Sequence, residues 1–423
     1  MGDIKSHNNS VKIILGVSLI INNIYMRGFF VKVEKIKSLL ERDGFWAGWI
    51  NILDRLLRVV KKMIIFSKGD VVFVSGLAGD PAMYRTECVA EELRAREFKT
   101  TTLYKDDIFL VYKLKKFKII VLHRVIVNER IKKILKQAKK INQTIIYDTD
   151  DLDFDAKIFR KTNMYQNLSR AQKEEHKKGV GLEILQNKQL KAITTPTSFL
   201  AEKLKKFKKP VFIVKNKLSK QELKWTREGR KKYLDRTKND KHVKIGYFSG
   251  SISHNRDFDK IIPALEIILN RYSNVKLCLV GYLDVNNKFY RKFRNQIIQL
   301  PFVPRKQHYQ NIAEIDINLA PLEMNDFCQA KSELKFFETG IIGVPTIATR
   351  NQTFSEAIED GRSGLLAANH DEWVRNLERL IDDKELRITL GEKARQVVLK
   401  KYLTSSGDNF EYYKFLEKII DED

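Results

Sequence analysis

The chain has 423 residues, of which 43% are hydrophobic and 31% are charged, with only 8 prolines and 20 glycines. This length allows two or three domains, and the composition excludes a disordered or collagen-like chain. The net charge is +25, but residues 1–250 carry 54 Lys and Arg against 27 Asp and Glu, whereas residues 251–423 carry 24 against 26. A basic first part beside a nearly neutral second part indicates that the first part meets an anionic partner.

The cysteines and the first apolar run indicate a protein of the cytoplasm. Cys88, Cys278 and Cys328 are odd in number and far apart, so they fit neither a disulfide framework nor a metal-binding spacing. The apolar run from Val11 to Met26 is interrupted by Lys and Asn side chains and is too short for a membrane-spanning helix. No signal-peptide cleavage site follows it. We expect no transmembrane segment and a location in the cytoplasm, either free or peripheral at the inner face of the membrane.

Residues 1–67 are interpreted as an N-terminal extension, because they lack the alternation of strands and helices that follows them. Within them, Trp46 and Trp49 lead into a segment from Arg55 to Lys62 where aliphatic residues are interleaved with Lys and Arg. This pattern is typical of a basic amphipathic helix. Such a helix can lie in the headgroup layer of an anionic membrane, or it can dock on the protein core, and the sequence leaves both interpretations open.

Short apolar strands alternate with amphipathic helices from residue 68 onward, which is typical of parallel sheets covered by helices. A first Rossmann-like domain is predicted over residues 68–215 and a second over residues 243–400. Residues 216–242 are rich in Lys and Arg without an apolar period and are interpreted as a basic linker. Residues 401–423 predict a helix that packs back on the first domain. The expected strands cover residues 71–74, 118–123, 144–147, 192–194, 211–214, 243–248, 275–280, 315–319 and 346–348.

A loop of small residues after the strand at 243–248 is the first candidate site. It includes Gly250 and Ser251 and leads into a helix start near Asp257. Loops of this kind can turn backbone N–H groups toward a phosphate. The alternative is an ordinary strand-to-helix turn in which Ser253 or Asp257 caps the helix.

The second candidate site is the spacing of Lys331, Lys335 and Glu338, which would place the three on one face of a helix. Two ammonium groups suit a diphosphate, and a carboxylate can accept hydrogen bonds from the two hydroxyls of a ribose. The spacing therefore predicts a nucleoside diphosphate site. The alternative is a solvated helix face with internal ion pairs.

The residues around this helix resemble the donor domain of the group 1 nucleotide-sugar glycosyltransferases. The resemblance is strong over residues 243–400 and moderate over residues 70–215. It implies the GT-B fold, in which two Rossmann-like domains face a cleft. The stretches that carry it are 301–304, 315–322, 331–349, 354–358 and 360–366, together with the loops at 79–85 and 147–152.

The resemblance implies a role for several residues of the second domain. Glu338 matches the family's ribose-binding Glu, Lys335 matches part of the diphosphate cradle, and Ala330 stands where the family often has a second Glu near the reacting sugar. Lys331 is expected to compensate for Ala330 by binding the leaving diphosphate. The expected donor-binding residues are Gly250, Ser251, His254, Arg256, Lys331, Ser332, Glu333, Leu334, Lys335 and Glu338.

The first domain is expected to supply the acceptor side, because ligands of open α/β sheets bind at the carboxyl ends of the strands. Asp148, Asp150 and Asp151 follow the strand at 144–147 and are the catalytic candidates. The alternative for each is loop capping or ion pairing. The acceptor-side candidates are Gly79, Tyr84, Arg85 and Arg124.

The function implied by the resemblance is transfer of a hexose-like sugar from a nucleotide sugar to a glycan or lipid-linked acceptor. We expect a retaining enzyme of surface-polysaccharide biosynthesis, with no cofactor and no metal, since fixed Lys, Arg and helix charges can stabilise the leaving group. The expected partners are the nucleotide sugar, the acceptor and an anionic membrane surface, but not nucleic acid. Two rivals are a basic nucleic-acid-binding protein and a phosphatase with Asp148 as nucleophile.

Overall fold

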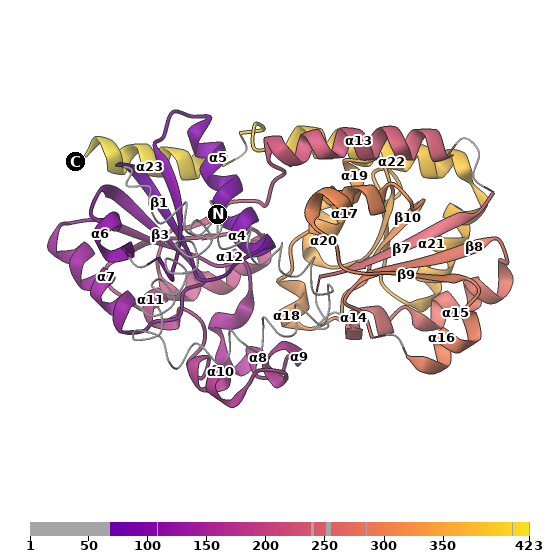
Figure 1. Cartoon of the computed structure of the whole chain (residues 1–423), viewed down its shortest axis with the longest axis horizontal. Helices are drawn as coiled ribbons and strands as arrows, with labels where there is room; N and C mark the ends of the chain where they lie inside the picture. The colour runs from indigo at the N-terminus through magenta and orange to yellow at the C-terminus, as the bar shows by residue number, and fades with distance from the viewer. Residues whose placement is uncertain are drawn as a thin grey trace, which may run out of the picture. The chain divides into compact units, whose positions relative to one another are not determined.

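The computed structural model describes residues 68–107, 109–237, 241–250, 255–284, 286–407 and 409–422. The chain divides into two compact units, Met1–Phe66 and Ser67–Asp423. The predicted N-terminal amphipathic helix, with Trp46 and Trp49, lies outside the described residues. The two sheets described below both belong to the second unit (Figure 1).

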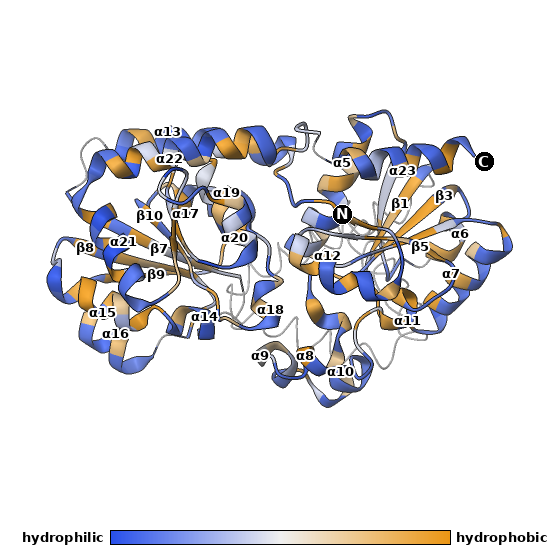
Figure 2. Ribbon diagram, turned by 180° about the vertical axis from the view of Figure 1, so that it is seen from behind, coloured by the Kyte–Doolittle hydropathy of each residue, from blue (hydrophilic) through white to orange (hydrophobic). Residues whose placement is uncertain are grey.

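The first sheet has six parallel strands in the order β2-β1-β3-β4-β5-β6. Apart from the edge strand β2, its strands are nearly continuous apolar runs, because helices cover both faces of a parallel sheet. In Figure 2 the strands are mainly hydrophobic, whereas helices such as α13 have a largely hydrophilic surface. The strands are β1 Gly69–Ser75, β2 Thr100–Tyr104, β3 Phe117–His123, β4 Thr144–Asp148, β5 Leu190–Thr195 and β6 Val211–Ile213.

The helices around the first sheet are mostly short. Among those that precede α13, the longest is α7, Glu129–Lys140, which is capped by the Asn128 side chain and buries Ile131, Ile134, Leu135 and Ala138 on one face. The others are α4 Asp80–Ala82, the π-helix η1 Met83–Cys88, α5 Val89–Arg94, α6 Leu110–Leu114, η2 Leu152–Phe154, α8 Ala156–Phe159, α9 Asn163–Gln166, α10 Arg170–Glu175, α11 Leu182–Leu185, α12 Ser198–Leu204 and η3 Lys205–Phe207.

The second sheet also has six parallel strands, in the order β12-β11-β10-β7-β8-β9. The strands are β7 Val243–Ser249, β8 Val275–Gly281, β9 Ile297–Leu300, β10 Ile317–Ala320, β11 Thr346–Thr349 and β12 Leu365–Ala367. The helices are α14 Asn255–Asp259, α15 Ile262–Arg271, α16 Asn287–Phe293, α17 Arg305–Ile312, α18 Asp326–Gln329, α19 Leu334–Gly340, α20 Gln352–Ala357, α21 His370–Asp382 and α22 Lys384–Lys401.

These two sheets confirm the predicted fold class, and their strand orders locate the ligand-binding edges. In each sheet the strand order reverses once, between β1 and β3 in the first sheet and between β7 and β10 in the second. Ligands of doubly wound sheets bind outside the carboxyl ends of the strands at this reversal. The loops after β3 and after β7 and β10 are therefore expected to carry ligand-binding residues.

The stretch interpreted as a basic linker is largely a helix, α13 Lys220–Thr237, which packs against α17. Its buried face consists of Glu222, Thr226, Gly229 and Tyr233. Because these residues are mostly polar or small, the sequence of this helix lacks the apolar stripe from which a helical period is recognised. A Cβ on Gly229 would lie 2.9 Å from the Tyr309 carbonyl oxygen. The absence of a side chain allows this close approach.

The C-terminal helix, α23 Phe410–Asp421, packs against the first sheet, where Tyr412 and Tyr413 join the same buried cluster as Val71 and Phe73. The buried Glu92 of α5 holds this helix, because it accepts hydrogen bonds from the Tyr413 hydroxyl and from Asn409. Among the described helices, none combines the length and apolarity that crossing a membrane requires.

Candidate active site

Helix α19 carries the two residues expected to bind a nucleoside diphosphate. Its start is fixed by the buried Glu333, whose Oε1 accepts a hydrogen bond of 2.8 Å from the Tyr402 hydroxyl. The Lys335 Nζ is buried 4.0 Å above the Tyr247 ring, and no described residue accepts a hydrogen bond from it. Burial lowers the pKa of Lys335 to about 8, against the opposing effect of Asp257 and Glu338. This ammonium group is therefore placed to take an anionic ligand.

Glu338 lies one turn further along α19, and both of its carboxylate oxygens have partners. Oε1 accepts a hydrogen bond of 2.5 Å from the Tyr84 hydroxyl and one of 3.0 Å from Arg305, and Oε2 lies 3.4 Å from Nε2 of His308. Burial alone would raise the pKa of Glu338, but Arg305 and His308 outweigh it and lower the pKa to about 2. Glu338 is thus a fixed negative charge.

Arg305, at the start of α17, joins the helices of the second domain to the π-helix η1 of the first. Its guanidinium binds Glu222 of α13 and the hydroxyls of Tyr84 and Tyr309, and it lies 3.4 Å from the Asp80 carboxylate. Sequence reasoning missed Arg305, His308 and Glu222, although the resemblance had included the preceding residues 301–304. The signal was present in the spacing of Arg305, His308 and Tyr309, which puts all three on one side of a helix.

Lys331 differs from the expectation that it shares a helix face with Lys335 and Glu338. The chain folds a short helix, α18, that ends at Gln329, and α19 begins only at Leu334, so Lys331 lies in the turn between them. Its ammonium nitrogen is 3.6 Å from Oδ2 of Asp151 and 4.6 Å from the centre of the Phe327 ring. Lys331 therefore contacts the carboxylates that follow β4.

The structure describes four of the remaining donor-side candidates. Gly250 is exposed just after β7, and Arg256 is exposed on α14. Ser332 accepts a hydrogen bond of 2.9 Å from Asn216, and Leu334 is the first residue of α19. Ser251 and His254 lie outside the described residues.

Asp148 is held by Arg85 and is almost completely buried. Arg85 donates to both Asp148 oxygens, at 3.1 Å from Nε and 2.5 Å from Nη2, and Thr194 donates to Oδ1 at 2.6 Å. The side chains of Arg85 and Asp148 are 0% and 2% exposed. This geometry favours the ion-pair alternative for Asp148. It argues against the phosphatase hypothesis, because a substrate does not reach the buried Asp148 carboxylate that would have to act as nucleophile.

Asp150 and Asp151 surround Arg124, which directly follows β3. Arg124 lies 3.0 Å from Asp150 and 3.6 Å from Asp151, and its Nε donates to Asp153 at 2.8 Å. Arg124 has φ of 44°, an unusual backbone conformation for a residue with a side chain. Burial works to raise the pKa of Asp150, but Arg124 and His123 outweigh it and hold that pKa well below its usual range. Asp150 and Asp151 thus belong to a fixed cluster beside Lys331.

The other acceptor-side candidates lie before and within the π-helix. Gly79 adopts φ of 80° at the start of α4 and is exposed, a conformation that favours glycine. Tyr84 is buried with its ring edge against Phe337, the centroids 5.9 Å apart. Tyr84 is therefore placed at Glu338, on the donor side of the site.

A cavity of about 310 Å³ adjoins Lys331. One wall comes from the segment between α8 and α9, and the other from α14, α18 and the loop after β10. Its lining residues are Ile158, Lys161, Thr162, Met164, Arg256, Asp257, Glu323, Asn325, Asp326, Phe327, Cys328 and Lys331.

Asp257, Glu323 and Cys328 in this cavity place potential metal-ligand atoms within 4.8 Å of one another. However, burial and then the nearby Asp257 raise the pKa of the Cys328 thiol to about 12. Since the thiolate is the form that binds metals, an ion at this group would have to displace the proton of Cys328.

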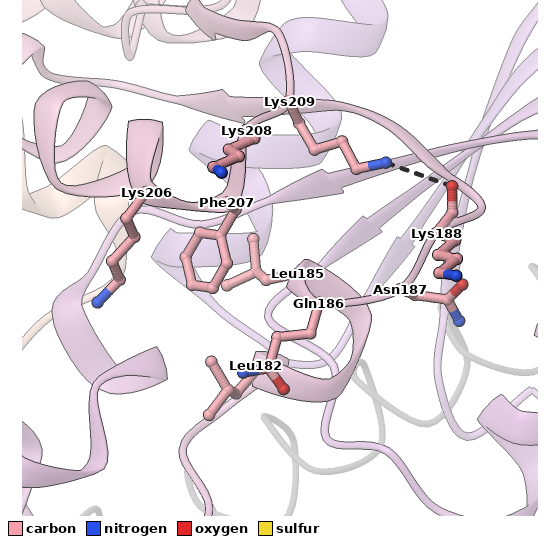
Figure 3. A pocket seen from close by; sticks show the side chains of 9 residues that line it. All are labelled: Leu182, Leu185, Gln186, Asn187, Lys188, Lys206, Phe207, Lys208 and Lys209. Atoms are coloured by element: carbon pink, nitrogen blue, oxygen red, sulfur yellow. Dashed lines mark hydrogen bonds between the residues drawn. The ribbon is translucent and has the colours of Figure 1, made fainter.

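A second hollow, of about 620 Å³, lies on the first domain between α11 and η3 (Figure 3). Its floor is Leu182, Leu185 and Phe207, and four lysines surround it. Lys209 donates to the Lys188 carbonyl at 3.3 Å, as the dashed line in Figure 3 marks. This hollow contains none of the candidate site residues.

The comparisons with known proteins agree with this geometry. Residues 229–397 match the family model of the group 1 glycosyl transferases. This segment contains Lys335 and Glu338, and its match confirms the resemblance inferred from the sequence.

Curated relatives match over a similar length. The capsular polysaccharide biosynthesis glycosyltransferase CapM of Staphylococcus aureus is 26% identical over 170 residues, which cover 39% of this chain and 43% of the relative. A D-inositol 3-phosphate glycosyltransferase of Pseudarthrobacter chlorophenolicus is 27% identical over 158 residues, 35% of this chain and 36% of the relative. The chain thus spans less than half the length of these two relatives.

Solved structures show the same fold over most of the chain. A glycosyltransferase from Rickettsia africae superposes with a TM-score of 0.59 at 13% identity, covering 85% of this chain and all of that one. HepE from Anabaena, solved in complex with UDP and glucose, gives a TM-score of 0.57 at 12% identity, covering 83% of this chain and all of that one. At these identities the likeness establishes the fold, which is GT-B.

Proposed function

We propose that the protein is a glycosyltransferase that takes a sugar from a nucleotide-sugar donor. The observation that carries this proposal is the pair Lys335 and Glu338 on α19, inside the segment that matches the group 1 family. A buried ammonium group without a hydrogen-bond acceptor among the described residues stands one turn from a carboxylate that stays ionised. This pairing fits the diphosphate and the ribose of a nucleoside diphosphate.

In the reaction, an acceptor hydroxyl forms a bond to the anomeric carbon while the bond from that carbon to the diphosphate oxygen breaks, and the hydroxyl proton passes to the departing diphosphate. Lys335 stabilises the charge that develops on the departing diphosphate, because the ammonium group is fixed in a partly desolvated place. We propose that no metal ion or other cofactor takes part. The outcome at the anomeric carbon is proposed to be retention, as the resemblance implies.

The acceptor is proposed to be a glycan or a lipid-linked sugar in surface-polysaccharide biosynthesis. Supporting this choice, the matched relative from Staphylococcus aureus is named for capsular polysaccharide biosynthesis. The excess of 54 basic over 27 acidic residues in residues 1–250 favours contact with an anionic membrane, where a lipid-linked acceptor resides. We propose peripheral attachment at the cytoplasmic face, through the basic segment around Trp46 and Trp49, and no role in binding nucleic acid.

Isothermal titration with UDP, GDP and ADP tests the donor site. Lys335→Ala and Glu338→Ala should each weaken the best-bound nucleotide, since a hydrogen bond to a charged group contributes about 1.5–3 kcal/mol. Glu359→Ala is a matched control, because the Glu359 side chain is exposed and pairs only with Arg362 among the side-chain interactions described. Unchanged affinity in a folded Lys335→Ala protein would refute the site.

Two further assays separate the proposal from its rivals. Turnover of a nucleotide sugar should persist in excess EDTA, whereas a phosphatase would release phosphate from simple phosphomonoesters in a Mg²⁺-dependent manner. Flotation with anionic liposomes should be lost at high salt, because exposed charges are screened within about 10 Å at 0.1 M ionic strength. Equal retention by mixed-sequence DNA at the same salt would favour the nucleic-acid rival.

A further inference from the structure

The cavity beside Lys331 lies at the strand reversal of the second sheet. Asp257 follows β7 on α14, and Glu323 follows β10 after Pro321 and Leu322. The two segments that contribute these carboxylates therefore follow the two strands between which the strand order changes direction. This is the position where doubly wound sheets bind ligands. A volume of about 310 Å³ is at the lower end of the usual range for small-molecule sites. The cavity therefore suits a small ligand group.

The chain lacks a carboxylate where the resemblance places one near the reacting sugar. Ala330 occupies that position, is completely buried, and packs in the same apolar cluster as Phe327. Its methyl group cannot accept a hydrogen bond from a sugar hydroxyl. Lys331 lines the cavity, but its ammonium group faces the Asp151 carboxylate at 3.6 Å. Recognition of the sugar hydroxyls therefore requires another side chain that accepts hydrogen bonds in place of the missing Glu.

We propose that Glu323 is this acceptor and that the cavity holds the transferred sugar, an inference that rests on the proposed function. Glu323 is half-buried in the lining, and its Oε2 accepts a hydrogen bond of 3.2 Å from Asn325. Asp257 is the positioning residue, because its Oδ1 accepts a 2.9 Å hydrogen bond from the Glu323 backbone N–H. Asp257 is 3% exposed, so the loop after β10 is tied down from within the protein.

The charges of the lining point to a neutral, hydroxyl-rich ligand. Three cationic side chains, Lys161, Arg256 and Lys331, are matched by three carboxylates, so the wall has no net charge to select an anion or a cation. Sugar hydroxyls both donate and accept hydrogen bonds, and they can use carboxylates and ammonium groups together. Phe327 adds the apolar surface that the ring of a sugar requires. A neutral hexose thus fits this wall better than a uronate or an amino sugar with a free ammonium group.

The cavity is also electrostatically connected to the diphosphate site. Asp257 is the charge that most favours the ammonium form of Lys335, and Lys331 opposes it. Asp257 thus belongs both to the lining of the cavity and to the charged surroundings of the Lys335 ammonium group.

The test compares a nucleoside diphosphate with its sugar. Titrations of the full chain use UDP, GDP, UDP-glucose and GDP-mannose, and the pair that binds wild type best is carried forward. Glu323→Ala should weaken the nucleotide sugar about tenfold, the effect of losing one hydrogen bond to a charged group, while the affinity for the free diphosphate changes less than about twofold. Glu323→Gln, which keeps the shape and one acceptor oxygen, should weaken it less. Glu359→Ala should change neither affinity.

The other possible results would overturn either the assignment of Glu323 or the proposed function. Equal weakening of the diphosphate and its sugar, or no change in either, overturns the assignment of Glu323 while leaving the donor site intact. If Glu323→Ala fails to fold, Glu323→Gln decides alone, and an unchanged preference for the nucleotide sugar overturns the inference. Wild-type protein that binds none of the four nucleotides overturns the proposed function itself.

Discussion

The Tyr84 hydroxyl donates a 2.5 Å hydrogen bond to Oε1 of Glu338, and thereby joins the π-helix after β1 to the helix that carries the donor-site residues. The bond is partly buried, and Arg305 contacts both residues. If Glu338 binds the ribose of the donor, the ribose hydroxyls must compete with Tyr84 for the same carboxylate. Tyr84 would then oppose nucleotide binding in the unliganded protein.

Replacing Tyr84 with Phe should therefore strengthen nucleoside diphosphate binding by up to about tenfold, because the competing hydrogen bond is lost while the ring remains packed on Phe337. Isothermal titration measures the change. Tyr290→Phe is the control, since Tyr290 is partly exposed on α16. Weaker binding by the Tyr84→Phe protein would show instead that the hydroxyl assists the nucleotide.

The pKa of about 8 at Lys335 predicts a pH-dependent affinity for the diphosphate. The ammonium form, which binds the anion, predominates below that pH, so the affinity should fall as pH rises from 7 to 9. Lys335→Arg, whose guanidinium stays charged over this range, should bind with little pH dependence. A wild-type affinity that is constant from pH 7 to 9 would contradict the assignment of Lys335 to the diphosphate.

The lowered pKa of Lys335 affects stability in the opposite direction: affinity for the diphosphate falls as pH rises, whereas the contribution of Lys335 to the free energy of unfolding increases. A lysine in the unfolded chain holds its proton up to its ordinary pKa of 10.5, whereas the folded protein releases it near 8. Between these values the unfolded state binds more protons, so the contribution of Lys335 to the free energy of unfolding rises with pH. Urea denaturation at pH 8 and 10 should show a larger increase for wild type than for Lys335→Met. An equal increase in both proteins would mean that Lys335 titrates normally.

Arg305 should be important for stability, because it neutralises Glu222 and Glu338 in a buried place. Arg305→Leu leaves two carboxylates without their main partner and should lower the free energy of unfolding by about 3–5 kcal/mol. Chemical denaturation monitored by tryptophan fluorescence provides the measurement. Lys306→Leu, one residue away and exposed, is the matched control and should change it by less than about 0.5 kcal/mol.

The periodic apolar pattern was sufficient to predict the fold class and nine of the twelve strands, from Val71–Val74 to the strand at 346–348. The other three, β2, β9 and β12, are edge or near-edge strands with short or polar sequences, such as Thr100 to Thr102 in β2. The helix α13 was not predicted either, since its buried face includes Glu222 and Gly229 and therefore shows no apolar period. Burial there depends on partners from distant parts of the chain, which periodicity does not reveal.

The candidate site divides in the same way. Lys335 and Glu338 could be found because they occupy one helix with the spacing of a known family. Arg305 begins another helix and Glu323 lies in a loop, and both are brought to the site by the order of the strands in the sheet. Lys331 was placed on the wrong element because the chain ends α18 and starts α19 around it. The spacing of residues along the sequence predicts that they share a helix face only if all of them lie in the same uninterrupted helix.

Asp148 provides the sharpest test of a sequence-based assignment, since we expected a catalytic role and the structure shows a buried ion pair with Arg85. Asp148→Asn removes the negative charge that balances a guanidinium with no exposed surface, so it should lower the free energy of unfolding by about 3–5 kcal/mol. Urea denaturation measures this loss.

A control separates stability from catalysis at this position. Thr194→Val removes the third hydrogen bond to Asp148 but keeps its charge, and should cost only about 1 kcal/mol, the usual value for a single hydrogen bond. Turnover of both variants is measured at a temperature where each is fully folded, together with nucleotide affinity. If folded Asp148→Asn protein retains wild-type stability yet loses about a hundredfold or more in turnover, Asp148 is catalytic after all. Turnover that follows the folded fraction instead assigns Asp148 to holding Arg85 and the end of β4 in place.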